Sequence, residues 1–393
     1  MQNTGEWLMW SAIAVGLYAY LGYPAAAALL ATLFGRPHRF EDIEPTVTLI
    51  IPAHNEEKVI AAKIENSLSQ DYPRDKLDIR VVSDGSDDTT DAIAREYESR
   101  GVTLQRVAVR GGKPNAVNLA VLDSDGEILV LCDANTMFAP DAVRKLVRHF
   151  ADPDVGAVTG DVRLQSQSTG YGEGESLYYR LERLVQRSES RLWSVIGVDG
   201  GMYAVRREVY RPNHPDVLID DFAVAMGVVR AGKRVIYDPE AVATEDAVVD
   251  PRQEFRRRSR TAAGGFQAAF GRLATPRARQ LGTWLAYVSH KVLRWLSPFV
   301  LVLAMLGGLL AVLAGNAGSW RWRADVAVVG LQGSLYLLAL VGLLYGKRRM
   351  PRLISLPFYF CLGNAAALAG FLKWMFGLQA VTWSHADRSQ IAQ

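Results

Sequence analysis

Hydrophobic residues concentrate at the two ends of the chain, and charged residues concentrate in its middle, from about residue 36 to residue 280. A helix needs about 20 apolar residues to cross a bilayer. Four stretches meet that length: residues 7–34, 297–315, 326–345 and 353–372. The expected divisions are a transmembrane helix in 1–35, a soluble domain in 36–275, an interface helix in 276–296, three transmembrane helices in 297–380 and a tail in 381–393.

Basic residues orient these segments, because loops rich in Lys and Arg stay on the cytoplasmic side of a membrane. Arg36 and Arg39 follow the first apolar stretch, and a basic cluster in 347–352 separates the third from the fourth. We therefore expect an integral membrane protein of the bacterial inner (plasma) membrane with a cytoplasmic soluble domain. Three spans after the domain place the carboxyl terminus outside, unless one span is re-entrant. A cleaved signal peptide is disfavoured, because the first stretch is too long and Glu6 stands where a basic cluster is usual.

The segment "WLAYVSHKVLRWL", residues 284–296, alternates apolar residues with Lys, Arg and His. Such a pattern predicts an amphipathic helix that lies on the membrane surface. The alternative is a buried helix of the soluble domain.

Within the middle of the chain, apolar runs alternate with segments of helical periodicity. The runs occupy residues 47–52, 77–82, 102–109 and 127–133. Strand–helix alternation predicts an α/β fold with a mostly parallel sheet. Asp84 and Asp133 stand at the ends of the second and fourth runs. Because ligands of such sheets bind beyond the carboxyl ends of the strands, both carboxylates are candidate ligand contacts.

The first strand is followed by "IPAHNEEKV" rather than by a glycine-rich phosphate loop, and no Walker loop is present. If a nucleotide binds, carboxylates that hold a divalent cation would have to neutralise its phosphates. The net charge is only +3, and Cys132 and Cys361 are the two cysteines of the 393 residues. Two cysteines exclude a disulfide framework and a cysteine zinc site.

Seven motifs now carry a resemblance. They are "IPAHNEE", "VVSDGSDDTTD", "GGKPNAVNLA", "CDANT", "GGMYAVRRE", "IDDFAVAMGVVRAGKRV" and "QEFRRRSR", in this order. Together they resemble the membrane-bound family 2 glycosyltransferases of the cellulose and hyaluronan synthase group. The resemblance implies a GT-A (Rossmann-like), mostly parallel sheet domain together with transmembrane helices.

On the donor side, the resemblance implies that Asp84 binds the base and ribose of a nucleotide, and that Ala53 and Glu56 line the nucleoside pocket. Lys113, at a helix start, suits a phosphate. The local alternatives are a solvated surface position for this lysine, Asn55 as the N-cap of the helix that follows it, and Asp87 or Asp88 as the N-cap of the next helix.

The motif "CDANT" resembles the D-x-D signature of the family, which coordinates Mg²⁺ or Mn²⁺ through the diphosphate. Asp133 is the implied metal ligand, and Asn135 supplies an uncharged oxygen at the third position. The alternative for Asp133 is a buried aspartate that caps the next turn, although the residues before it are wholly apolar.

On the acceptor side, the resemblance implies that Asp221 is the catalytic base and that Asp220 is the acidic residue before it. A sugar hydroxyl is a poor nucleophile, so a positioned carboxylate must remove its proton. Helix capping is the alternative for this pair. Asp161, Gly200 and Gly201 match segments that line the acceptor side, and a strand with a bulge is their alternative.

The motif "QEFRRRSR" matches the Q-x-x-R-W of polymerising relatives except at its last position. The resemblance assigns Gln253 and Arg256 to the nucleotide, whereas Arg257 replaces the tryptophan that contacts the acceptor sugar. The alternative is a basic segment that binds anionic lipids.

The expected function is inverting transfer of a sugar from a nucleoside diphosphate sugar, by analogy a UDP-sugar, to a glycan or lipid-linked acceptor. The expected cofactor is Mg²⁺ or Mn²⁺, membrane lipids are expected partners, and nucleic acid is not. A processive synthase that extrudes its product is an alternative, against which Arg257 and the few spans argue. A nucleotide-sugar sensor is another, but sensing needs no base at Asp221. A transporter is disfavoured, because no charged residue lies inside a predicted span.

Overall fold

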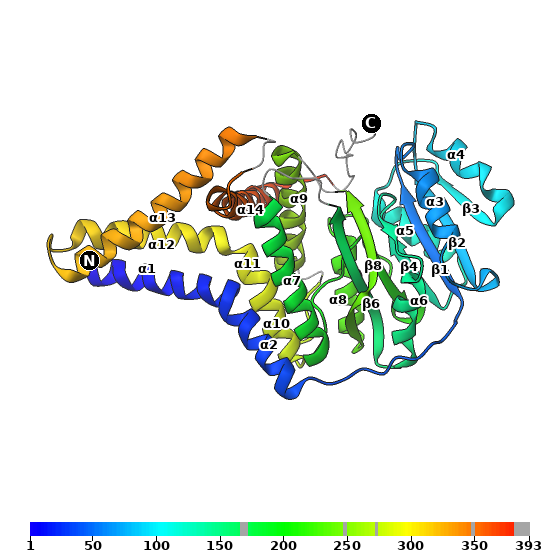
Figure 1. Cartoon of the computed structure of the whole chain (residues 1–393), viewed down its shortest axis with the longest axis horizontal. Helices are drawn as coiled ribbons and strands as arrows, with labels where there is room; N and C mark the ends of the chain where they lie inside the picture. Colours follow the sequence, from blue (N-terminus) through cyan, green and yellow to red (C-terminus); the bar gives the residue numbers. More distant parts are fainter. Residues whose placement is uncertain (166–171, 247–249, 272–273, 347–349, 381–393) are drawn as a thin grey trace.

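The computed structural model describes residues 1–165, 172–246, 250–271, 274–346 and 350–380. Long helices fill one end of the molecule, and a sheet covered by helices fills the other (Figure 1). The tail expected in 381–393 and part of the basic cluster in 347–352 lie outside the described residues.

An eight-stranded sheet forms the centre of the domain, in the order β3-β2-β1-β4-β7-β6-β8-β5. The pairs β1–β2, β2–β3, β1–β4 and β6–β8 are parallel, whereas β7 runs antiparallel to both of its neighbours and β5 runs antiparallel to β8. The expectation of a mostly parallel sheet is therefore confirmed. The strands are β1 (Val47–Ala53), β2 (Leu77–Asp84), β3 (Val102–Val107), β4 (Ile128–Cys132), β5 (Met137–Phe138), β6 (Val155–Gln165), β7 (Met202–Arg206) and β8 (Arg234–Asp246).

Both faces of the sheet are covered, which explains why its central strands are apolar without alternation. In β1, Leu49 and Ile51 pack into one core, and Ile50 packs into the core on the opposite face. The helices of the first face are α3 (Ile60–Leu68), α4 (Thr90–Glu96) and α6 (Ala142–Val147). Those of the second face include α5 (Lys113–Leu122) and α8 (Asp220–Arg230).

The capping alternatives for Asn55 and Asp88 are not confirmed. Asn55 is not a helix cap, because α3 begins only at Ile60. It adopts a left-handed backbone conformation, with φ of 56°, and its side-chain oxygen accepts a hydrogen bond from the Asp87 N–H at 2.9 Å. Asp88 is not the N-cap of α4 either, because Thr89 takes that position, but its carboxylate accepts a hydrogen bond from the Thr90 N–H at 2.9 Å.

Four helical segments are long and apolar enough to cross a membrane. The first is one helix made of α1 (Gln2–Leu17), a π turn η1 (Tyr18–Gly22) and α2 (Tyr23–Phe34). The others are α12 (Ser297–Ala314), α13 (Trp320–Tyr345) and α14 (Arg352–Met375). Helix α13 begins before the expected span and so includes Asp325, which is buried.

The segment between the domain and α12 packs one face into the domain and exposes the other. It contains α10 (Leu281–Ala286), a π turn η6 (Tyr287–Val292) and α11 (Leu293–Trp295). Ala286 and Tyr287 are buried in the core of the domain. Leu281, Leu285 and Val288 are exposed at a spacing of one helical turn. One face therefore belongs to the domain, and the other keeps an apolar stripe of the kind found at membrane surfaces.

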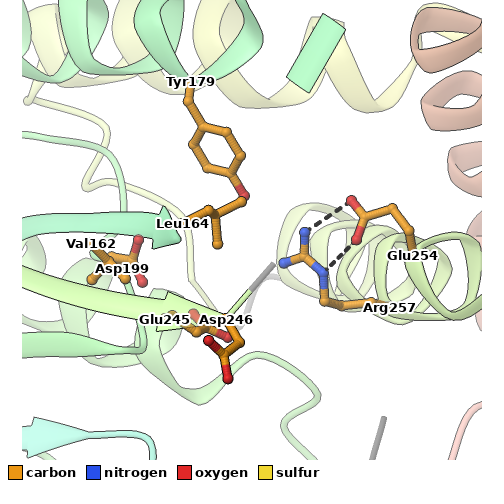
Figure 2. A pocket seen from close by; sticks show the side chains of 8 residues that line it. All are labelled: Val162, Leu164, Tyr179, Asp199, Glu245, Asp246, Glu254 and Arg257. Atoms are coloured by element: carbon orange, nitrogen blue, oxygen red, sulfur yellow. Dashed lines mark hydrogen bonds and ion pairs between the residues drawn. The ribbon is translucent and has the colours of Figure 1, made fainter. Parts of the chain in front are cut away.

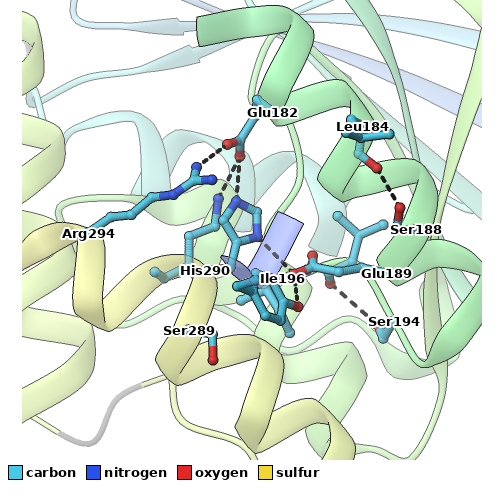
Figure 3. A network of polar contacts seen from close by, with 12 residues as sticks. Glu182, Leu184, Ser188, Glu189, Ser194, Ile196, Ser289, His290 and Arg294 are labelled. Atoms are coloured by element: carbon cyan, nitrogen blue, oxygen red, sulfur yellow. Dashed lines mark hydrogen bonds and ion pairs between the residues drawn. The ribbon is translucent and has the colours of Figure 1, made fainter. Parts of the chain in front are cut away.

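A buried ionic network joins the membrane helices to the domain through α7 (Gly172–Leu192) (Figure 3). The two ring nitrogens of His290 lie 2.9 Å from Glu182 and 2.9 Å from Glu189, both on α7. Glu189 also accepts a hydrogen bond from the Tyr23 hydroxyl at 2.7 Å, and Glu182 pairs with Arg294 at 2.7 Å. The first membrane helix, α7 and the α10–α11 segment thus meet at one set of charges.

Candidate active site

Lys113 and Asp133 form an ion pair at the carboxyl edge of the sheet. Asp133 follows β4, Lys113 begins α5, and the Lys113 Nζ donates to Asp133 Oδ1 at 2.5 Å. The ammonium also lies 4.0 Å from Asp220 Oδ2. Burial alone would lower the pKa of Lys113, but the charges of Asp133, Asp220 and Asp221 outweigh burial and raise it. This lysine is therefore a fixed cation inside an acidic site, and it is not a solvated surface residue.

Asp221 lies in the first turn of α8, and its Oδ1 accepts a hydrogen bond from the Phe222 N–H at 2.7 Å. Burial and the neighbouring charge of Asp220 raise the pKa of Asp221 to about 6, although Lys113 acts in the opposite direction. Its other oxygen lies against Gly200, where an added Cβ would be 2.7 Å from Oδ2. The motifs around Gly200 and Asp221, distant in sequence, therefore meet in the fold.

Asp199 is a member of this site that the sequence did not single out. Its carboxylate accepts a hydrogen bond from the Gly201 N–H at 3.0 Å. Burial raises the pKa of Asp199 to about 7, and the charges of Glu245, Asp221 and Asp133 act in the same direction. The signal was present, because Asp199 stands directly before the two glycines that begin the motif "GGMYAVRRE".

The Asp84 carboxylate is fully buried and holds the loop that precedes Lys113. Its two oxygens accept hydrogen bonds from the Gly111 and Gly112 N–H groups, each at 2.8 Å. Gly112 has a φ of 87°, a conformation that favours glycine. The nucleoside contact implied for Asp84 stays a prediction, and the observed contacts give the residue a positioning role as well.

The other two expected nucleoside contacts lie at the same edge of the sheet. Ala53 ends β1 and is fully buried within one core, so a ligand would meet its backbone rather than its side chain. The Glu56 N–H donates to the Thr90 hydroxyl at 2.8 Å, which ties this loop to the start of α4.

A pocket opens between the ends of β6 and β8, helix α7 and helix α9 (Pro251–Phe270) (Figure 2). Arg257 extends from α9 to its wall, where Glu254 pairs with it through two contacts of 2.9 Å each. Burial would raise the pKa of Glu254, but the charges of Arg257 and Arg258 lower it to about 2. The lining residues are Val162, Leu164, Tyr179, Asp199, Glu245, Asp246, Glu254 and Arg257.

The successive arginines of α9 point to different surroundings. Both Arg256 and Arg257 are exposed, but only Arg257 is among the described residues that line the pocket. Arg258 donates to Glu254 at 2.6 Å and to the Tyr359 hydroxyl of α14. Gln253 lies one turn before Arg257 on the same helix. The structure thus brings Arg257 to the site more directly than Arg256, to which the resemblance gave the phosphate.

Asp161 has contacts that favour a structural role over the acceptor contact implied for it. It is buried on β6, and its oxygens pair with Arg183 at 2.5 Å and with Arg163 at 2.8 Å. Both of its oxygens are therefore paired, and the pair with Arg183 holds β6 to α7.

The residues at this edge fit a divalent cation only if its ligands are shared with a substrate. Among the described residues, no group of three or more His, Cys, Asp or Glu is arranged to hold a metal. Asp133 nevertheless has a partly exposed carboxylate, and Asn135 supplies an amide oxygen two residues later. Asp220 Oδ2 is buried without a hydrogen-bond partner. Oxygen donors and excess negative charge suit Mg²⁺ or Mn²⁺, whose remaining ligands would be phosphate oxygens.

Comparison with known proteins supports this description. Residues 48–212 match the family described as "Glycosyl transferase family 2". The solved mannosyltransferase PcManGT from Pyrobaculum calidifontis, in complex with GDP-Man and Mn²⁺, matches with a TM-score of 0.73 and 26% identity, over 95% of this chain and 100% of that chain. The structural match identifies the fold as GT-A, and the family match shows that the domain with this fold is similar to glycosyltransferases. Residues 48–212, which are less than half of the chain, are thus similar to the domain of that family.

Two curated relatives are also similar. The probable glycosyltransferase YdaM of Bacillus subtilis (strain 168) is 27% identical over 233 residues, which are 56% of this chain and 55% of that protein. The chain thus spans about half the length of this relative. The beta-monoglucosyldiacylglycerol synthase of Nostoc sp. (strain PCC 7120 / SAG 25.82 / UTEX 2576) is 24% identical over 394 residues, 95% of this chain and 81% of that protein.

Proposed function

We propose that the chain is an inverting glycosyltransferase that moves a sugar from a nucleoside diphosphate sugar to an acceptor hydroxyl at a cytoplasmic membrane surface. The observation that carries the proposal is the Asp221 carboxylate. It is partly buried, its pKa is raised to about 6, and it lies next to Gly200, which directly follows the pocket residue Asp199. General bases of glycosyl transfer need a pKa near the working pH and a fixed position.

In the proposed reaction, the acceptor oxygen bonds to the anomeric carbon while the bond from that carbon to the diphosphate breaks. The hydroxyl proton moves to Asp221, and the configuration at the anomeric carbon inverts because the attack comes from the face opposite the diphosphate. Lys113 lies within 4.0 Å of Asp220 and is placed to balance charge near the leaving group. Asp133 and Asn135 would hold a Mg²⁺ or Mn²⁺ ion, which when bound neutralises charge on the diphosphate.

The nucleoside and the sugar of the donor have to be identified by experiment, because the sequence resemblance and the relatives suggest different donors. The sequence resemblance favours UDP, whereas the Pyrobaculum mannosyltransferase was solved with GDP-Man. The Nostoc relative is named for a glucosyl transfer to diacylglycerol, which supports a membrane-held acceptor. Four apolar helices and the exposed stripe of α10 support the membrane location.

The test is release of nucleoside diphosphate by the purified full chain with a panel of nucleotide sugars and Mg²⁺ or Mn²⁺. We expect metal-dependent release from one donor, and a loss of about 10²- to 10⁴-fold in Asp221→Asn. The matched control is Asp141→Asn, which removes the charge of a partly exposed aspartate that pairs with Lys145 at 2.7 Å. Release that survives in Asp221→Asn would exclude this residue as the base, and no release from any donor would contradict the proposal.

A further inference from the structure

The pocket of Figure 2 differs in charge from a site that binds a phosphate. Of the eight lining residues in the described part of the chain, Asp199, Glu245, Asp246 and Glu254 are acidic, and Arg257 is the single cation. The surplus of carboxylates remains even when Asp199, with a pKa of about 7, carries a proton. Like charges at short range in a partly buried site repel strongly.

The one cation of the lining is already neutralised. Both oxygens of Glu254 face the Arg257 guanidinium at 2.9 Å, and Glu254 itself is only 1% exposed. Drawing Arg257 away to a phosphate would leave a buried carboxylate with Arg258 as its remaining partner. Arg257 is therefore unsuited to act as a phosphate clamp in the way a free guanidinium would.

The pocket adjoins the proposed base, so its charge bears on the acceptor. Asp199 on its wall is followed directly by Gly200, which contacts Asp221 Oδ2. A divalent cation does not reverse the balance, because the diphosphate of the donor brings two negative charges of its own. The other side chains of the lining are Tyr179, Val162 and Leu164, and Figure 2 shows the Tyr179 ring pointing from α7 toward Leu164.

We propose that the acceptor enters this pocket with an uncharged, hydroxyl-rich group, and that lipid phosphates are excluded as acceptors. Hydroxyls donate hydrogen bonds to carboxylates without bringing charge, and the tyrosine ring and the two aliphatic side chains provide an apolar wall for the carbon skeleton of a polyol. The group belongs either to the end of a glycan or to a glycerol lipid. The inference rests on the proposed function and names the acceptor class for it.

The experiment compares acceptors in nanodiscs that contain the full chain and the donor identified above. Diacylglycerol and an alkyl glycoside represent the two neutral sources, and phosphatidic acid and a polyprenyl phosphate represent the charged class. We expect transfer to at least one neutral acceptor to be more than tenfold faster than to either phosphate. Transfer to diacylglycerol would identify a lipid as the acceptor, and transfer to the alkyl glycoside would identify a glycan.

A charge variant tests the cause of the preference. Asp246→Asn removes one pocket carboxylate and should narrow the ratio of neutral to charged acceptor rates several-fold, whereas Glu98→Gln, at an exposed site in the 3-10 turn after α4, should leave it unchanged. A ratio equal in both variants contradicts the charge argument. Faster transfer to a phosphate, or donor turnover that no neutral acceptor stimulates, overturns the inference. Absence of any donor turnover overturns the proposed function instead.

Discussion

The Asp221 carboxylate sits among charges that act in opposite directions. Burial, Asp220 and Asp133 raise its pKa, and Lys113 and the Phe222 N–H lower it, with a result of about 6. A base works only when it is deprotonated, so its protonation below that pH removes activity.

The pH dependence follows from this balance. We expect kcat/KM to be level above about pH 7 and to fall about tenfold for each unit below pH 6. Asp220→Asn removes a charge that raises the Asp221 pKa, so the acidic fall should move to lower pH. Initial rates across pH 4.5 to 8.5 measure both profiles. An acidic limb at the same pH in both proteins would show that another group controls the rate.

Gly200 gives a second test at the residue scale. A methyl group there would lie 2.7 Å from Asp221 Oδ2, so Gly200→Ala should displace the carboxylate and lower the rate by at least about tenfold. Gly227→Ala, on α8 itself, is the matched control, because nothing lies within 4 Å of the added methyl group. It should keep full activity and stabilise the helix by about 0.5–1 kcal/mol. Equal rates in the two variants would contradict the close approach.

At the scale of elements, the sequence predicted the strands of the parallel half well, because their apolar runs are continuous. The runs at 47–52 and 77–82 became β1 and β2 with small changes at their ends. Glu245 was missed, because it reaches the site only through the pairing of β8 with β6. A single sequence contains no local signal for that order. The Asp84 contacts with Gly111 and Gly112 are hidden for the same reason.

The network on α7 predicts how the elements depend on one another. The Glu182 carboxylate lies within hydrogen-bond distance of His290, Lys291 and Arg294. The substitution Glu182→Ala removes the partner that these three side chains share. Removing one partner from a buried ionic group costs about 3–5 kcal/mol. We expect a clear drop in the melting temperature of the detergent-solubilised chain.

The control for that measurement is Glu208→Ala, whose side chain is 66% exposed and lies 4.0 Å from Arg206. Its melting temperature should stay within about 1–2 degrees of the parent, as is usual for exposed ion pairs. A small effect in both variants would mean that α7 does not depend on this network for its position.

At the scale of the whole molecule, α14 packs along a helix of the domain over most of its length. It runs alongside α9, from the Arg258–Tyr359 contact to Gly370 against Ala262 and then to Trp374 against Phe270. Both halves of α14 therefore stay close to a helix of the domain, as a re-entrant or surface-lying segment would.

This packing predicts that the carboxyl terminus lies on the same side of the membrane as the domain, which differs from a simple count of three spans. A reporter fused after residue 393 should be active when it is a cytoplasmic fluorescent protein and inactive when it is a periplasmic phosphatase. The same pair of fusions after residue 316, in the connection between α12 and α13, should give the opposite result. A periplasmic carboxyl terminus would show that α14 crosses the membrane.

Glu254 connects the pocket to the apolar helix α14 through two arginines of α9. One carboxylate holds Arg257 at the pocket and Arg258 at Tyr359 of α14. The same carboxylate is therefore a shared partner of the pocket wall and of the arginine that contacts α14. We therefore expect a displacement of α14 to be transmitted through Arg258 and Glu254 to Arg257, and so to change the width of the cavity.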